Sequence, residues 1–178
     1  EIALRVELVY EAEASFSLPT TGGLLGAATS NTTASVPDYR TLNFQSGIAE
    51  DTLLYGSIRQ ADWSNHQVAI APQTQAAPTS SFSDTTTYTI GIGRKISDEW
   101  SVTASYKTEE ASENTGTSLL SPTDGYEAIG AAAIYTLSNG TEITVGVNYS
   151  MVGDKTVTSS GVSGLFSDNR VVTSGIKV

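Results

Sequence analysis

Residues 142–151 read Glu-Ile-Thr-Val-Gly-Val-Asn-Tyr-Ser-Met, and apolar side chains occupy every second position of this stretch. The apolar positions are Ile143, Val145, Val147, Tyr149 and Met151. The residues between them are polar, acidic or glycine. Successive side chains of a β-strand point to opposite faces, so this period of two predicts a strand whose two faces meet different surroundings.

The same alternation recurs along the chain. Residues 2–11 and 100–109 alternate as clearly, and in both the charged residues fall on the polar face. Weaker segments with the same period are residues 39–48, 53–63, 86–96, 126–137 and 170–178. Residues 53–63 and 126–137 leave the assignment of faces open, and a β-bulge there would shift the register. The pattern therefore predicts eight strands.

Short and long connections alternate between these segments. The short ones are residues 49–52, 97–99 and 138–140. The long ones span about residues 13–37, 65–84, 110–124 and 153–168, and they are rich in Ser, Thr, Gly, Pro and Asn. Outer-membrane barrels join tilted strands of about 9–11 residues by short periplasmic turns and longer extracellular loops. The sequence thus predicts an all-β, antiparallel transmembrane β-barrel with long extracellular loops.

A soluble antiparallel meander is the alternative to a membrane barrel. The period of two alone does not decide whether the apolar face meets lipid or protein. The alternating connections favour the membrane, and the aromatic residues agree with them. Trp100 and Tyr135 lie near short turns. Four others lie near long loops, and they are Tyr10, Trp63, Tyr88 and Tyr126. Two interfacial girdles are expected from these positions.

Composition limits the function. The chain of 178 residues is expected to form one domain, residues 1–178, and it has no Cys. Its formal net charge of −10 argues against nucleic acid as a partner, because phosphate binding needs a basic surface. His66 is the only histidine and falls in a long polar connection, so a Ser-His-Asp triad is not expected. No enzyme activity, cofactor or metal site is predicted.

Several motifs occur in order along the chain and together outline three hairpins. They are Val36-Pro37, Gly47–Leu53, Ala61–Ser64, Tyr88–Gly93, Asp98–Ser101, Pro122–Tyr126 and Val145–Tyr149. In this order and spacing the chain resembles the FadL/TodX-type outer-membrane transporters of hydrophobic compounds such as long-chain fatty acids. The resemblance covers the whole chain.

The resemblance implies that the chain is the C-terminal portion of a larger barrel, because that family closes with fourteen strands. The missing N-terminal barrel strands and the hatch segment that plugs the barrel would then lie outside this sequence. Outer-membrane barrels usually end in an aromatic residue, whereas this chain ends in Val178. A few further residues are therefore also expected after it.

The function implied by the resemblance is passive uptake of hydrophobic molecules, such as long-chain fatty acids, across the bacterial outer membrane. Lipopolysaccharide blocks direct partitioning of such solutes, so the expected partners are outer-membrane lipid, lipopolysaccharide and a hydrophobic small-molecule ligand. Burial of the apolar ligand surface would supply the binding energy, at about 25 cal/mol per Å².

Apolar residues within the polar connections are the candidate ligand-binding residues. They are Leu24, Leu25, Val68, Ile70, Leu119, Leu120, Val162, Leu165 and Phe166. Packing of the loops against one another explains them equally well. Arg5 and Lys107, on the polar faces of their strands, could meet a ligand carboxylate, although ion pairs with Glu7 and Glu109 explain them as well.

A complete eight-stranded outer-membrane barrel with a structural or adhesive role is the alternative function. The interior of such a small barrel is filled by side chains. Pairing between the first and the last strand would indicate the small barrel, whereas two unpaired edges would indicate part of a larger one.

Overall fold

Antiparallel strands make up most of the computed structural model, which describes residues 3–22, 28–68, 80–112, 118–119, 121, 123–159 and 161–178. The strands are β1 (Leu4–Glu11), β2 (Ala14–Gly22), β3 (Ala28–Val36), β4 (Tyr39–Ala49), β5 (Thr52–Ala61), β6 (Thr85–Lys95), β7 (Trp100–Glu109), β8 (Tyr126–Thr136), β9 (Glu142–Val152), β10 (Lys155–Ser159), β11 (Val162–Phe166) and β12 (Arg170–Lys177). A short 3-10 helix, η1 (Trp63–Asn65), follows β5. Within the described ranges, no helix is long and apolar enough to span a membrane.

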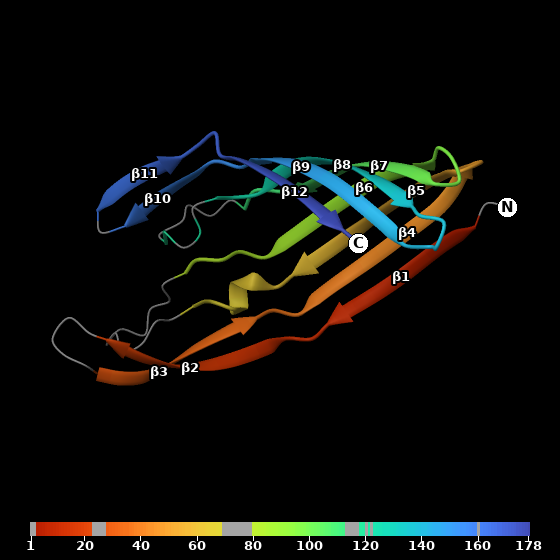
Figure 1. Cartoon of the computed structure of the whole chain (residues 1–178). Helices are drawn as coiled ribbons and strands as arrows, with labels where there is room; N and C mark the ends of the chain where they lie inside the picture. Colours follow the sequence, from red (N-terminus) through yellow and green to blue (C-terminus); the bar gives the residue numbers. More distant parts are fainter. Residues whose placement is uncertain are drawn as a thin grey trace.

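Eight of the strands form one curved antiparallel sheet in the order β1-β4-β5-β6-β7-β8-β9-β12 (Figure 1). These are the eight strands that the period of two predicts, so the all-β antiparallel prediction is confirmed. The sheet is open in the described part of the chain, because β1 pairs only with β4 and β12 only with β9. The alternative of a closed eight-stranded barrel is therefore wrong for this chain.

Within the described residues, no protein layer covers the apolar face of the sheet. Its register aligns apolar residues across neighbouring strands, as in the row Leu8, Leu42, Ile58 and Tyr88. These side chains are exposed: Leu8 to 75 % and, further along the sheet, Val147 to 49 %. Among the described hydrophobic residues only Pro37, Ala61, Ala128 and Val157 are buried. This polarity is the reverse of a soluble meander, whose apolar face would be its core.

Pairing with neighbouring strands assigns the faces that the sequence left open. Leu53 pairs with Gly93 on the polar face, and Leu54 pairs with Ile92 on the apolar face. The register shift lies between Gly47 and Ala49, in the strand opposite the start of β5. The bulge is therefore in β4 rather than within residues 53–63 or 126–137.

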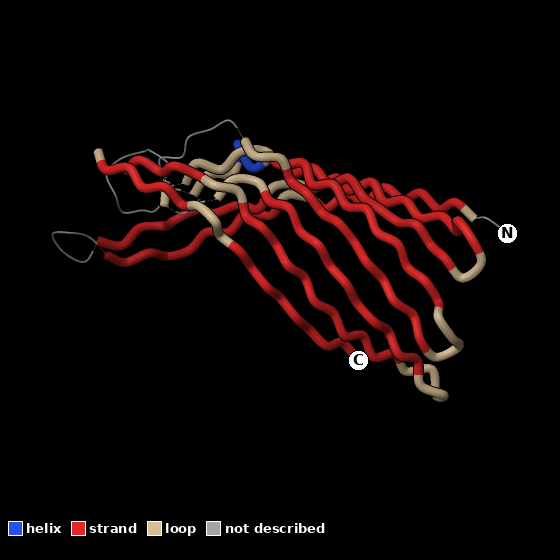
Figure 2. Tube along the Cα trace, turned by 90° about the horizontal axis from the view of Figure 1, so that it is seen from above, coloured by secondary structure: helices blue, strands red, loops and turns tan. Residues whose placement is uncertain are grey.

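Two of the predicted long loops contain β-hairpins of their own. Strands β2 and β3 pair along their whole lengths, and so do β10 and β11. Both hairpins lie beyond the same end of the sheet, opposite the short turns (Figures 1 and 2). Their sequences are dominated by Ser, Thr and Gly, which gives little contrast between faces and so no clear strand pattern.

The aromatic residues divide between the two faces. Trp100 and Tyr135 are paired on the apolar face near the short turns, with ring centroids 4.9 Å apart. Tyr10 and Tyr88 are also exposed on the apolar face, as a girdle requires. The girdle prediction is wrong for Trp63 and Tyr126. Trp63 follows the end of β5 in η1, and Tyr126 shares the polar face with its partner Glu109, so both line a cavity.

Candidate ligand-binding site

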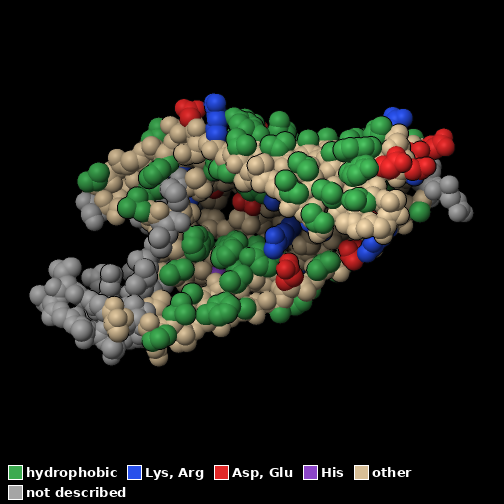
Figure 3. Space-filling view, viewed as in Figure 1, with side chains coloured by type: hydrophobic (Ala, Val, Ile, Leu, Met, Phe, Trp, Pro, Cys, Tyr) green, Lys and Arg blue, Asp and Glu red, His purple; other side chains and the backbone are tan. Residues whose placement is uncertain are grey.

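The polar face of the sheet lines the hollow that Figure 3 shows between the two sides of the molecule. Hydrogen-bond register places one residue from each of the eight strands in a row across this face. The row is Arg5, Gln45, Tyr55, Gly91, Ser105, Gly130, Asn148 and Thr173. Long side chains, Arg5, Gln45 and Tyr55, occupy the β1 side of the row, whereas Gly91, Ser105 and Gly130 in its middle are small.

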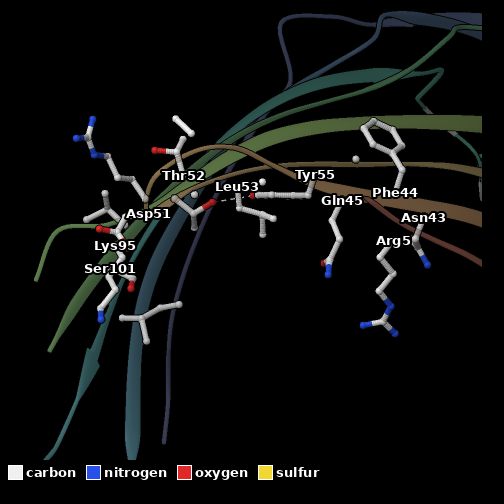
Figure 4. Close-up of a pocket in the computed structure, with 18 of the residues that line it drawn as sticks. Arg5, Asn43, Phe44, Gln45, Asp51, Thr52, Leu53, Tyr55, Lys95 and Ser101 are labelled. Atoms are coloured by element: carbon white, nitrogen blue, oxygen red, sulfur yellow. Dashed lines mark hydrogen bonds between the residues drawn. The ribbon is translucent and has the colours of Figure 1, made fainter. Parts of the chain in front are cut away.

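A first open cavity of about 800 Å³ lies over β1, β4 and β5 toward the short turns. Figure 4 shows Arg5, Asn43 and Gln45 pointing to the same side of the sheet, whereas Phe44 points to the other. Arg5 forms an ion pair with Glu7 at 3.1 Å. The sequence prediction that Arg5 lies on the lumen side therefore agrees with its position, and its partner is the acidic neighbour two residues along.

Glycines in the sheet accommodate two aromatic rings. A Cβ added to Gly91 would collide with the ring of Tyr55, and one added to Gly56 would collide with the ring of Phe44. The Tyr55 hydroxyl lies 2.8 Å from the Thr103 hydroxyl, and Thr103 also donates to the Ile92 carbonyl at 3.1 Å. Tyr55 is thus held flat along the wall, which keeps the centre of the hollow open.

A second open cavity of about 710 Å³ lies at the end of the sheet that carries the long connections. Its aromatic side includes Trp63 and Phe82, with ring centroids 5.6 Å apart, and Tyr39 packs edge-on against Trp63. The ammonium of Lys107 lies over the ring of Tyr126, 5.3 Å from its centroid. A cation over an aromatic face is held by the quadrupole of the ring.

The acidic residues of the second cavity are hydrogen-bonded to other groups. Glu109 accepts from the Thr87 hydroxyl at 2.7 Å, and among the described residues no ion pair joins it to Lys107, which the sequence allowed. Asp124 accepts from the backbone amide of Ser112 at 2.6 Å and from its hydroxyl at 3.1 Å. These bonds fix the loop that follows β7 against the start of β8.

The base of the β10/β11 hairpin is clamped to the strand beside it. The Gly153 amide donates to the Gly125 carbonyl at 2.9 Å, and the Asp124 amide donates to the Gly153 carbonyl at 3.4 Å. A Cβ on Gly153 would collide with the Asp124 carbonyl, and Gly125 has a φ of +68°, so both positions require glycine. The clamp positions Lys155, which is only 6 % exposed and lines the second cavity.

The turn after β5 forms a compact polar cluster beside the second cavity. Asn65 donates to both carboxylate oxygens of Asp62 at 2.9 Å, and Ser64 donates to one of them at 3.2 Å. The Asn65 hydrogen bonds are the main reason that the pKa of Asp62 lies below its ordinary value. His66 is buried, and its Nδ1 lies 2.8 Å from the Ser35 hydroxyl, which links the turn to β3.

A third groove of about 510 Å³ connects the two cavities along the polar face. It shares Thr103 with the first cavity, and Asn148 and Thr173 with the second. Its floor consists of small residues, among them Gly130, Ala132, Gly146 and Gly175. The three cavities thus adjoin one another along the polar face, from the short turns to the long connections.

The predicted apolar ligand-binding residues are only partly brought together. Leu119 and Leu165 are 64 % and 67 % exposed at the end with the long connections, and Val162 is exposed on the same hairpin as Leu165. Phe166 is half-buried and pairs with Lys155 across the hairpin. Leu24, Leu25, Ile70 and Leu120 lie outside the described residues. The sequence analysis missed Lys155, because a lysine in a polar segment gives no sign that it is buried.

The structure groups few residues suited to catalysis or metal binding. Within the described ranges there is no cluster of three or more His, Asp or Glu side chains that could hold a metal ion. Arg5 and Lys107 face the same hollow but line different cavities, so they do not form one site. The arrangement offers a groove lined mainly by small residues, with Lys177 near the short turns, and an aromatic, partly charged cavity at the other end.

The chain was compared with known proteins by sequence and by structure. No family model matches the sequence, and no curated protein matches it. Solved structures do match. The crystal structure of a Pseudomonas aeruginosa FadL homologue has a TM-score of 0.73 and 17 % sequence identity, over 96 % of this chain and 46 % of its own.

Two further solved structures are similar. The CymD monoaromatic hydrocarbon channel has a TM-score of 0.59 and 13 % identity, over 97 % of this chain and 46 % of its own. The Pseudomonas putida toluene transporter TodX has a TM-score of 0.52 and 17 % identity, over 86 % of this chain and 41 % of its own. The chain thus spans less than half the length of these structures, which is consistent with the predicted C-terminal portion. The structural likeness confirms the resemblance that the sequence indicated: the chain has the fold of FadL/TodX-type outer-membrane transporters.

Proposed function

We propose that this chain forms one wall of a channel through which hydrophobic small molecules, such as long-chain fatty acids, cross a bacterial outer membrane passively. The solved structures with the same fold include a hydrocarbon channel and a toluene transporter, and none of the three is described as an enzyme. The chain spans less than half the length of these structures. We therefore also propose that further strands, outside this sequence, form the rest of the channel wall.

The row of adjoining cavities on the polar face carries this proposal. They share lining residues from one end of the sheet to the other, and Gly130, Ala132, Gly146 and Gly175 line the middle one. Small side chains leave room for a solute between the two cavities. A small barrel with a structural role would instead fill its interior with side chains.

The exposed apolar face supports a position within the lipid bilayer. Its side chains would be costly to leave in water, at about 25 cal/mol per Å² of apolar surface. Paired aromatic rings at Trp100 and Tyr135 suit the interface near the short turns, which we place on the periplasmic side. The long connections would then lie outside the cell, beside lipopolysaccharide.

Capture of the ligand is assigned to the second cavity and the hairpins around it. Trp63 and Phe82 supply aromatic surface, and the exposed Leu119 and Leu165 supply apolar contacts near the mouth. Lipopolysaccharide resists partitioning of apolar solutes, so a protein surface that binds them from outside would increase their rate of entry. No energy source is needed, because release down a concentration gradient drives transport.

The test is uptake of radiolabelled oleate and of labelled toluene by intact Gram-negative cells that lack their own uptake channel and produce the protein containing this chain. Ala132→Trp places a large ring in the groove, whereas Ala133→Trp on the same strand faces the opposite side. We expect Ala132→Trp to lower uptake at least fivefold and Ala133→Trp to leave it nearly unchanged. Surface biotinylation would verify equal amounts of each variant in the outer membrane. Equal uptake by all three proteins, or no uptake above empty cells, would refute the channel.

A further inference from the structure

The side-chain amide of Gln67 joins the two ends of the long connection between β5 and β6. Its Nε2 donates to the carbonyls of Phe82 at 2.8 Å, Ser64 at 3.0 Å and Trp63 at 3.2 Å. Its Oε1 accepts from the backbone amide of Phe82 at 2.8 Å and from the Ser80 hydroxyl at 2.9 Å. Because carbonyls accept and a backbone amide donates, only this orientation of the Gln67 amide satisfies its backbone partners. Both the donor and the acceptor of this side chain are thus engaged within the protein.

Two of these hydrogen bonds hold the backbone of Phe82 at both of its polar groups. The Gln67 amide donates to the Phe82 carbonyl and accepts from the Phe82 N–H, which is the two-point contact that paired residues of neighbouring strands make. Phe82 itself lies outside the strands. A further bond, from the Val68 N–H to the Ser80 hydroxyl at 2.7 Å, joins the same two segments. The side chain of Gln67 therefore does for Phe82 what a strand ladder does for the residues of the sheet.

The backbone held in this way places the Phe82 ring against Trp63. The two ring centroids are 5.6 Å apart, and the ring planes meet at 67°. Tyr39, the first residue of β4, packs against Trp63 with ring centroids 6.3 Å apart, and the Arg59 guanidinium lies 4.0 Å from the centroid of the Tyr39 ring. Residues of the sheet therefore support Trp63, whereas the position of Phe82 depends on Gln67.

Gln67 supports the second cavity without lining it. Trp63 and Phe82 line this cavity, and Gln67 does not. A ligand there would meet two rings set at an angle to each other, which offer it two apolar surfaces. A gap of about 1 Å forfeits up to about half of the dispersion energy of a contact, so the residues that hold such rings in place decide how much of their surface a ligand can use.

We infer that Gln67 is a positioning residue, which holds Phe82 against Trp63 and thereby sets how tightly the second cavity binds an apolar ligand. This inference rests on the proposed function and deepens it, because it assigns the tightness of capture to a side chain that does not touch the ligand. Without the Gln67 amide, the Phe82 backbone loses both of these hydrogen bonds and its ring is no longer fixed beside Trp63.

The experiment measures the initial rate of labelled oleate uptake against oleate concentration, in intact cells that lack their own uptake channel and produce the protein containing this chain. Gln67→Met keeps the length of the side chain and removes its hydrogen bonds, and Gln67→Glu keeps the accepting oxygens and loses the donated bonds. Phe82→Ala removes the ring, and it is also combined with Gln67→Met. The control is Gln60→Met, which removes an exposed amide from the apolar face of the neighbouring strand, β5.

We expect both Gln67 variants and Phe82→Ala to raise the half-saturating oleate concentration about fivefold, the effect of losing roughly one hydrogen bond or aromatic contact. The maximal rate and the amount of protein at the cell surface should stay nearly unchanged. Gln60→Met should alter none of these quantities. Residues that act through one another are not additive, so adding Gln67→Met to Phe82→Ala should raise the half-saturating concentration by less than about twofold more.

Other outcomes separate this inference from the proposed function. Fully multiplied effects in the double variant would mean that Gln67 does not act through Phe82. An unchanged half-saturating concentration in the Gln67 variants, or loss of both variants from the cell surface, would limit Gln67 to a role in folding or to none. Each of these results overturns the inference and leaves the channel standing. No saturable uptake by the unsubstituted protein would overturn the proposed function and the inference together.

Discussion

The ring of Tyr55 lies against the backbone of Gly91 on the neighbouring strand, and its hydroxyl reaches Thr103 one strand further, at 2.8 Å. One side chain thus spans three strands of the sheet. The next residue of β5, Gly56, receives the ring of Phe44 on the opposite face. Aromatic rings that cover glycines on neighbouring strands help to fix the register of a sheet. Here one such ring lies on each face of the sheet, at adjacent residues of β5.

Gly91→Ala is expected to destabilise the folded protein, because its Cβ would collide with the Tyr55 ring and displace it. Such overpacking costs about 1–3 kcal/mol. Gly93→Ala is the matched control on the same face of the same strand, where a Cβ would make only an ordinary contact, at 3.8 Å from the Val102 carbonyl. Urea unfolding in lipid vesicles measures both. Equal midpoints for the two variants would show that the ring yields without strain.

Ile90→Lys tests whether the apolar face meets lipid. Ile90 is 51 % exposed in the middle of β6, and its neighbour Thr89 points to the polar face. A lysine facing the bilayer midplane costs about 2–4 kcal/mol, whereas one facing the lumen costs little. We therefore expect Ile90→Lys to lower the unfolding free energy by that amount and Thr89→Lys to lower it by far less. A harmless Ile90→Lys would indicate that water, rather than lipid, covers this face.

Leu165→Ser tests the predicted capture surface. Leu165 is 67 % exposed on β11, so its removal should not disturb packing. If it contacts ligand, initial uptake of oleate at low concentration should fall about two- to fourfold through loss of apolar contact area, with the unfolding free energy unchanged. A fall in stability with normal uptake would instead assign Leu165 to packing between loops. Thr156→Ser, on the same face of the hairpin, serves as the control.

The turn after β5 is expected to loosen in acid. Hydrogen bonds from Asn65 and Ser64 hold the pKa of Asp62 below its ordinary value of 3.8. The carboxylate therefore contributes stability that is fully present above that value and is lost as pH falls through the lowered pKa. Hydrogen exchange of residues 62–68, corrected for intrinsic rates, should accelerate as the pH falls below the ordinary pKa of 3.8. Asp62→Asn should remove most of this pH dependence, and an unchanged profile would contradict the assignment to Asp62.

The number of strands and their two faces could be predicted from the sequence. Lipid on one side and a lumen on the other impose a period of two on each strand, and this period is local, as residues 142–151 show. The boundaries agree to within a few residues: residues 86–96 were predicted where β6 spans Thr85–Lys95. Long connections at one end follow from antiparallel pairing once the strands are known.

Only the tertiary structure decided which way the less regular residues face. Leu53 and Leu54 are equivalent in the sequence, and pairing with β6 places the first on the polar face and the second on the apolar one. The same applies to Tyr126. Its position near a long loop predicted a place in an aromatic girdle, but its pairing with Glu109 puts it on the polar face, beside Lys107. Lys155 is buried two residues after Gly153, whose amide donates to the carbonyl of Gly125, 28 residues earlier in the chain. The period of two is a property of residues that are neighbours in the sequence. The face on which an irregular residue lies, and how deeply it is buried, depend instead on strands that are distant in the chain. For this reason the sequence determined the sheet but not its binding surface.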